Sequence, residues 1–182
     1  MINKFLIILL LSSGVLFGDV VENINAEPSI FDAILQVEEK ESKSKLLEDV
    51  KKFVDNTYNE VQNKILDFAH SFLGQKYQFG ASKNSSRVDC SLYTQNVYSK
   101  AGIKIPRTSI EQSKLGVKVS KDELQAGDLL FFNTNKKAIS HVGIYIGDNK
   151  MIHASYGVKK VIIEDINKKY FKDRFVVAKR VL

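Results

Sequence analysis

One cysteine in this sequence has the setting of a nucleophile. Cys90 is the only cysteine, so it cannot form a disulfide within the chain. It follows Asp89, a residue type favoured at helix N-caps, which predicts that the thiol lies in the first turn of a helix. Unpaired N–H groups and the helix dipole favour a thiolate there, and the same N–H groups can face an oxyanion. The alternative is a small buried hydrophobic residue, which most free cysteines are.

A thiol nucleophile needs a base, and the chain offers three histidines. His141 and His153 lie on consecutive predicted strands joined by a short turn. If their side chains meet, His141 accepts the thiol proton and His153 bonds the far ring nitrogen, which fixes the orientation of His141. His70 lies beside Ala69 in a predicted helix, which favours a structural role.

Alternation of side chains along a strand restricts this pairing. A regular two-residue turn at Asp148-Asn149 would pair Ile144 with His153 and put the histidines on opposite faces. We therefore predict a bulge, or an odd-length connection that pairs Tyr145 with His153, with both imidazoles directed at Cys90. The side chains expected on the opposite face are those of Val142, Ile144 and Ile146.

The same three residues could instead bind zinc. Cys90 and His141 are 51 positions apart and the two histidines 12 apart, which matches none of the short-spaced zinc motifs. We therefore expect no metal and no organic cofactor.

Helices are predicted before the histidines and strands around and after them. Apolar residues recur every three or four positions from Leu46 to Phe72, which predicts an amphipathic helix in two pieces, one to about Asn63 and one over Ile65–Leu73. Residues 36–45 are typical of a solvated linker or a helix start. Further signals predict a helix from Cys90 to Ala101, a short helix capped by Thr108 and Glu111, and strands at 129–132, 139–146, 151–155, 161–164 and 175–181. This order indicates an α+β domain with N-terminal helices packed on an antiparallel β-sheet.

The N-terminal residues resemble an export signal. Lys4 precedes an apolar stretch from Phe5 to Phe17, so we expect a signal peptide at 1–18, with cleavage as late as residue 26 as an alternative. The protein would then be exported to the periplasm or cell envelope, with no stable membrane span after processing. An uncleaved N-terminal anchor is the alternative.

Charge divides the remaining chain. Residues 27–66 carry 6 basic and 9 acidic side chains, whereas residues 67–182 carry 20 basic and 10 acidic ones. We interpret residues 27–62 as an acidic helical extension that could bind a protein partner, and residues 63–182 as the main domain. Its basic balance suits an acidic polymer or simply a solvated surface, and export argues against nucleic acid.

Six ordered segments resemble the NlpC family of papain-like cell-wall cysteine peptidases, over about residues 63 to 180. They are Tyr77-Gln78-Phe79-Gly80-Ala81, Asp89-Cys90-Ser91, Pro106-Arg107-Thr108-Ser109, Leu124 to Phe132, Ser140 to Gly147, and Ile152-His153-Ala154.

The resemblance implies a papain-like fold and a triad of Cys90, His141 and His153. It implies cleavage of peptidoglycan stem peptides, commonly between γ-D-glutamate and a diamino acid. Tyr77 would lie near the oxyanion, and Ser91 is grouped with it as an oxyanion- or substrate-binding residue.

The sequence departs from the family pattern at three places. Leu92 replaces a glycine and could narrow the substrate groove, Ala81 replaces the second glycine of a pair, and the loop before Cys90 is about one residue longer. Two rival functions stay open: another acyl-transfer or amidase reaction on the same scaffold, and a catalytically silent wall-binding or scaffold protein.

Overall fold

The computed structural model describes residues 30–135 and 138–182. The predicted signal peptide and its cleavage point lie outside the described residues. The chain divides into two units, residues 1–50 and residues 51–182, and every strand that the structure describes belongs to the second unit. Among the described residues, no helix combines the length and the apolar character needed to cross a membrane.

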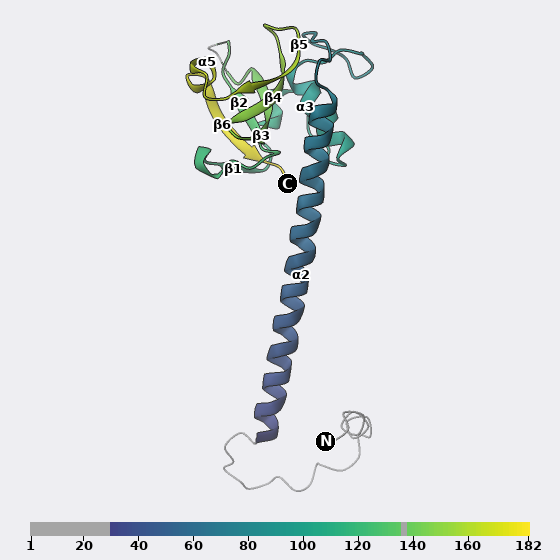
Figure 1. Cartoon of the computed structure of the whole chain (residues 1–182), viewed down its shortest axis with the longest axis vertical. Helices are drawn as coiled ribbons and strands as arrows, with labels where there is room; N and C mark the ends of the chain where they lie inside the picture. Colours follow the sequence, from purple (N-terminus) through teal and green to yellow (C-terminus); the bar gives the residue numbers. More distant parts are fainter. Residues whose placement is uncertain (1–29, 136–137) are drawn as a thin grey trace. The chain divides into compact units, whose positions relative to one another are not determined.

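Helix α2 runs without a break from Ile30 to Ser71 (Figure 1). The predicted division near Asn63 is therefore wrong, because neither glycine nor proline interrupts the backbone hydrogen bonding there. Residues 36–45 are helical as well. Gly74 follows the helix with φ of 82°, a left-handed conformation typical of the residue after a helix end, as predicted.

The sheet has six strands in the order β1-β6-β2-β3-β4-β5, and every neighbouring pair is antiparallel. Strands β1 and β5 are the two edges of this sheet. The bounds are Val117–Val119 for β1, Leu129–Phe132 for β2, His141–Gly147 for β3, Lys150–Ser155 for β4, Lys160–Asp165 for β5 and Phe175–Arg180 for β6. Five of them match predicted strands within two residues at each end.

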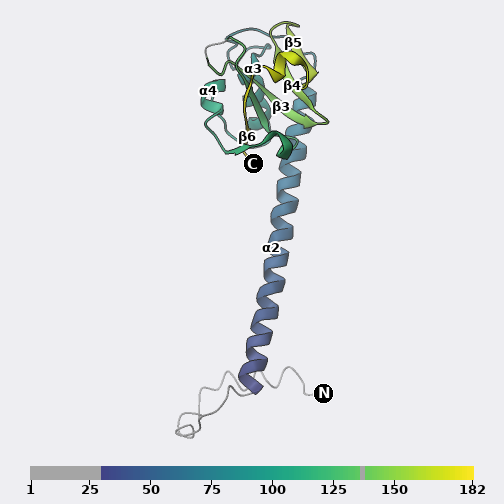
Figure 2. The ribbon, with the colours of Figure 1, turned by 90° about the vertical axis from the view of Figure 1, so that its left-hand side faces the viewer.

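Helix α3, Cys90–Lys100, packs on one face of the sheet together with the last turns of α2 (Figures 1 and 2). Alternation divides the strands between two cores. Val142 and Ile144 of β3 face α3, whereas Tyr145 and its neighbour Met151 lie in the smaller core on the other face. This arrangement of helices on an antiparallel sheet is the α+β papain-like fold that the sequence predicted.

Four short elements complete the fold. Helix α4, Ser109–Gln112, begins at its predicted cap Thr108, whose hydroxyl accepts a hydrogen bond from the Glu111 N–H. Strand β1, a 3₁₀ turn at Lys121–Glu123 and helix α5, Lys169–Lys172, were not predicted from the sequence. Each spans only three or four residues, too few for a periodic pattern.

Candidate active site

Cys90 is the first residue of α3, as the sequence predicted. Asp89 has extended backbone angles and serves as the N-cap, with its carboxylate accepting a hydrogen bond of 2.8 Å from the Leu92 N–H. The thiol therefore stands at the end of the helix that carries unpaired N–H groups.

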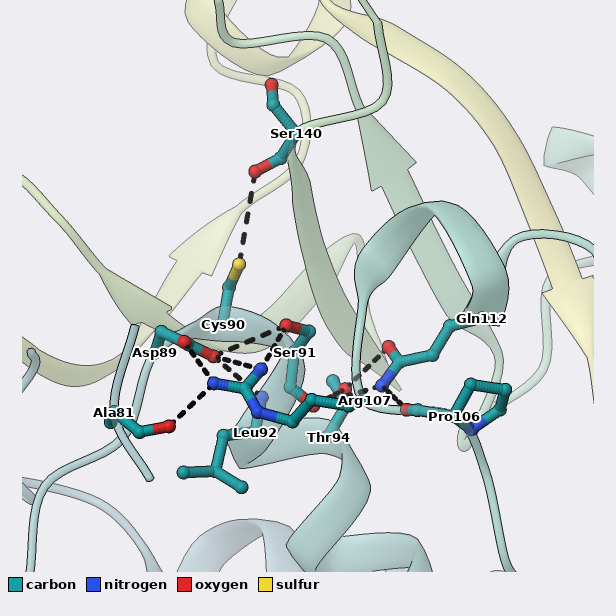
Figure 3. A network of polar contacts seen from close by, with 10 residues as sticks. All are labelled: Ala81, Asp89, Cys90, Ser91, Leu92, Thr94, Pro106, Arg107, Gln112 and Ser140. Atoms are coloured by element: carbon teal, nitrogen blue, oxygen red, sulfur yellow. Dashed lines mark hydrogen bonds and ion pairs between the residues drawn. The ribbon is translucent and has the colours of Figure 1, made fainter. Parts of the chain in front are cut away.

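Arg107 holds the loop before α3 in place, a role that sequence reasoning did not assign. Its guanidinium binds both carboxylate oxygens of Asp89, donates 2.8 Å to the Ser91 hydroxyl and donates 2.7 Å to the Ala81 carbonyl (Figure 3). The planar fork of an arginine suits such a multiple contact. Arg107 thus fixes the residues on both sides of Cys90.

A buried glutamine ties the next segment to α3. The Gln112 amide donates to the Ser91 and Pro106 carbonyls and accepts from the Thr94 hydroxyl (Figure 3). The side chain is fully buried, so these bonds satisfy groups that would otherwise be costly to bury. Together with Arg107, Gln112 anchors the Pro106-Arg107-Thr108-Ser109 segment beside the thiol.

The thiol environment corrects the prediction of a favoured thiolate. Burial, and then the charge of Asp89, raise the pKa of Cys90 to about 11, although the N–H groups of Val142, Ser91 and Cys90 itself oppose this. The sulfur lies 4.0 Å from the Ser140 carbonyl oxygen. The helix terminus does supply N–H groups to the sulfur, but desolvation and the negative charge of Asp89 together outweigh their effect on the pKa.

The connection between β3 and β4 decides where the histidines point. Asp148 and Asn149 form a two-residue turn, both with positive φ, and Gly147 pairs with Lys150. The register then shifts, because Ile146 has no partner.

This bulge confirms one of the two predicted solutions. The pairs beyond the bulge are Tyr145 with Met151 and Ile144 with Ile152, so the predicted three-residue loop and the pairing of Tyr145 with His153 are wrong. The bulge restores both histidines to the same face of the sheet.

The two imidazoles are in direct contact. His141 Nε2 lies 2.8 Å from His153 Nδ1, and the rings are nearly perpendicular at 88°. Burial, and then the charge of His153, lower the pKa of His141 to about 3, against the opposing effect of Glu164. His141 is therefore a neutral imidazole near pH 7, able to accept a proton.

His153 bonds His141 through Nδ1, and the expectation that both rings are directed at Cys90 stays a prediction. Its second nitrogen, Nε2, lies 2.9 Å from Glu164 Oε2, so both of its nitrogens are already bonded. The other carboxylate oxygen of Glu164 accepts a 2.8 Å bond from Lys168. Glu164 was missed because its proximity to His153 depends on the register between β4 and β5, for which the sequence carries no local signal.

Cys90, His141 and His153 line one cleft of about 1020 Å³. His70 is exposed on α2, with Nδ1 2.8 Å from the Leu66 carbonyl oxygen, and does not line this cleft. The geometry thus gathers a thiol at a helix terminus and two bonded histidines around one space, as expected for acyl-transfer chemistry.

The NlpC/P60 family profile matches residues 74–180 of the sequence. The chain belongs to the NlpC/P60 family. It is 37% identical over 124 residues to the murein DD-endopeptidase MepS/murein LD-carboxypeptidase of Escherichia coli K12, a match that covers 68% of this chain and 64% of that protein. It is 36% identical over 138 residues to the gamma-D-glutamyl-L-lysine dipeptidyl-peptidase of Bacillus cereus, covering 70% of this chain and 41% of that protein.

A solved NlpC/P60 family protein from Bacillus cereus has the same fold, with a TM-score of 0.61 and 36% identity over 66% of this chain and 40% of that one. The peptidoglycan hydrolase RipB of Mycobacterium tuberculosis shares the fold at a TM-score of 0.60 and 24% identity, covering 68% of this chain and 66% of that one. The chain spans less than two thirds of the length of the curated relatives described above.

Tyr77 lines the cleft of this NlpC/P60 domain, with its ring edge-on to Tyr156 at a centroid distance of 5.8 Å. Burial, and then the nearby Cys90, raise its pKa to about 12, so the phenol stays protonated and can donate a hydrogen bond. Ser91 also lines the cleft, and its buried hydroxyl is bonded to Asp89 and Arg107, so its role in binding the oxyanion or the substrate stays a prediction. What Ser91 offers the thiol is its backbone N–H group.

The departures from the NlpC/P60 pattern have structural explanations. Leu92 is fully buried in the core between α3 and the sheet and does not line the cleft, so the expectation that it narrows the groove is wrong. Ala81 lines the cleft and offers its carbonyl to Arg107. Within residues 30–135 and 138–182, no three His, Cys, Asp or Glu side chains are placed to hold a metal.

Proposed function

We propose that the chain is a cysteine peptidase that hydrolyses stem peptides of peptidoglycan, with Cys90 as nucleophile, His141 as general base and His153 as the residue that orients His141. The observation that carries the proposal is the 2.8 Å contact between the histidines in a cleft shared with the thiol at the start of α3. Membership of the NlpC/P60 family supports the substrate class.

The proposed reaction proceeds through an acyl-enzyme. Burial disfavours a thiolate or an imidazolium alone, so proton transfer from Cys90 to His141 accompanies attack of the sulfur on the substrate carbonyl. The carbonyl becomes an oxyanion near the N–H groups at the start of α3, with the Tyr77 hydroxyl as a further donor. His141 then returns its proton to the departing amine, and water hydrolyses the thioester with His141 again as the base.

We propose the bond between γ-D-glutamate and the diamino acid as the scissile bond. The name of the Bacillus cereus relative gives this bond, with lysine as the diamino acid. The name of the Escherichia coli relative gives a DD-endopeptidase instead, so cleavage of a D,D peptide bond is the second candidate.

We further propose that the protein is exported and acts in the cell envelope, in the periplasm where the envelope has one. Peptidoglycan is part of the cell envelope, which supports this location, and a signal peptide at residues 1–18 would provide the route. The 27–62 extension is proposed to bind a protein partner, because Phe53 and Val54 are 71% and 57% exposed.

Digestion of purified peptidoglycan tests the function directly. The masses of the released fragments identify the cleaved bond. Fragments that end at γ-D-glutamate support the first candidate, and fragments from cleaved D,D cross-links support the second. Cys90→Ala is expected to release no fragments while keeping the melting temperature within a few degrees of wild type, because only a small side chain is lost. Full release by Cys90→Ala would refute the cysteine mechanism.

A further inference from the structure

His153 is buried, with 2% of its surface exposed, and its ring packs edge-on against Phe171. A buried imidazole needs partners for both of its nitrogens, since an unsatisfied polar group costs about 1–3 kcal/mol. The partners are His141 Nε2 at 2.8 Å and Glu164 Oε2 at 2.9 Å. Each contact has a direction, because a neutral imidazole carries one donor and one acceptor nitrogen.

Glu164 decides these directions. An ionised carboxylate only accepts hydrogen bonds, and Lys168 holds its other oxygen at 2.8 Å. The bond to His153 and the charge of Lys168 both favour the ionised form and lower the pKa of Glu164 to about 2. A neutral His153 must therefore carry its proton on Nε2, which leaves Nδ1 as an acceptor.

The constraint passes on to the proposed base. Because His153 Nδ1 accepts, the proton between the two rings belongs to His141 Nε2. A neutral His141 with its proton on Nε2 keeps a lone pair on Nδ1. That nitrogen is the one His153 leaves free, so the thiol proton of Cys90 can be transferred only to it.

We infer that Glu164 is a positioning residue that sets the tautomers of both His153 and His141, so that His141 presents an unprotonated Nδ1 to the thiol. The inference rests on the proposed function for its catalytic consequence, but the tautomers themselves are a property of the folded protein without substrate.

The register of the sheet explains why Glu164, and not the adjacent Asp165, binds His153. His153 pairs with Ile162 across the β4–β5 ladder, and Glu164 is two residues further along, on the same face. Asp165 is the next residue, exposed, and its carboxylate accepts from the Asn167 N–H. It provides a matched control with the same charge on the same strand.

Nitrogen NMR of protein labelled with ¹⁵N-histidine tests the inference. The sequence has only three histidines, and the exposed His70 gives an internal reference. In the wild type we expect His141 and His153 both to be protonated on Nε2. Protonation of either ring on Nδ1 in the wild type would overturn the inference, and this measurement requires no variant to fold.

Glu164→Gln extends the test to activity. An amide can donate as well as accept, so the Nδ1-protonated forms of both rings should become populated and kcat should fall on the order of 10–100-fold, with little change in KM. Asp165→Asn should change neither quantity. Unaltered tautomers and kcat in Glu164→Gln would refute the role.

The two proposals fail in different ways. Wild-type activity in Cys90→Ala would refute the peptidase mechanism, whereas the NMR signals would still report whether Glu164 sets the tautomers. A loss of kcat in Glu164→Gln with unchanged tautomers would refute only the positioning role.

Discussion

Arg107 and Asp89 form a forked ion pair one residue before the proposed nucleophile, with two guanidinium nitrogens on the two carboxylate oxygens. Asp89 is simultaneously the N-cap of α3. The ion pair therefore joins the position of the Cys90 thiol to a segment 18 residues further along the chain.

Replacement of this arginine by lysine should be costly although the charge is kept. In Arg107→Lys a single ammonium cannot reach Asp89, Ser91 and the Ala81 carbonyl together, so we expect kcat/KM to fall about tenfold or more and the protein to lose about 2–3 kcal/mol of stability. Peptide hydrolysis and denaturant unfolding measure the two effects. Arg87→Lys, at an exposed position, is the control, and equal behaviour of the two variants would contradict the role of the fork.

A second prediction concerns stability against pH. The pKa of His141 is lowered to about 3 in the fold and is about 6.5 when unfolded, so the unfolded chain binds more protons between these values. The contribution of His141 to the free energy of unfolding is complete above pH 6.5 and decreases as the pH falls. Between pH 6.5 and 5.5 it decreases by about 1 kcal/mol. Chemical denaturation at both pH values should show this loss in the wild type.

The matched variant is His141→Asn, which cannot titrate. Its loss of stability over the same interval should be smaller by about 1 kcal/mol. Glu164, with a pKa lowered to about 2, contributes to acid sensitivity only below about pH 4.5 and does not affect this interval. Identical losses in the wild type and His141→Asn would show that the pKa of His141 is not depressed.

Local signals in the sequence predicted local structure well. Asp89 as an N-cap, Gly74 and Gly102 after helix ends, and Thr108 with Glu111 all act within four residues, and the structure contains each of them. Such signals predicted the position of Cys90 at the start of a helix, while its chemical role stays a proposal.

Contacts between segments that lie far apart in the sequence could not be predicted in this way. Arg107 binds Asp89, and Glu164 binds His153, because the fold brings these side chains together. Their spacing in the sequence does not indicate either contact. Leu92 shows the same limit, since only the packing of α3 decides that this residue faces the core instead of the cleft.

A third prediction concerns Phe53, an exposed apolar residue near the start of the 51–182 unit. Phe53 is 71% exposed, so Phe53→Lys should leave both the melting temperature and kcat of the isolated protein unchanged. Binding of a partner from the cell envelope, measured with wild type and variant side by side, should weaken in the variant. A lower melting temperature would instead mean that Phe53 packs within the protein itself.

The last prediction concerns the bulge at Ile146. The turn residues Asp148 and Asn149 pair Gly147 with Lys150, and Ile146 is the extra residue before Tyr145 pairs with Met151. Deleting Ile146 closes a regular hairpin while Tyr145 and Ile144 keep their partners, so the two histidines stay on the same face. The deletion should cost about 1–3 kcal/mol of stability, because Ile146 packs against the main core, and kcat should stay within a few-fold of wild type. Inserting one alanine between Val142 and Gly143 instead moves His141 to the opposite face, and its activity should disappear even where circular dichroism shows a folded protein. If the Ile146 deletion were folded but inactive, the bulge itself, and not the parity of the register, would be what aims His141 at Cys90.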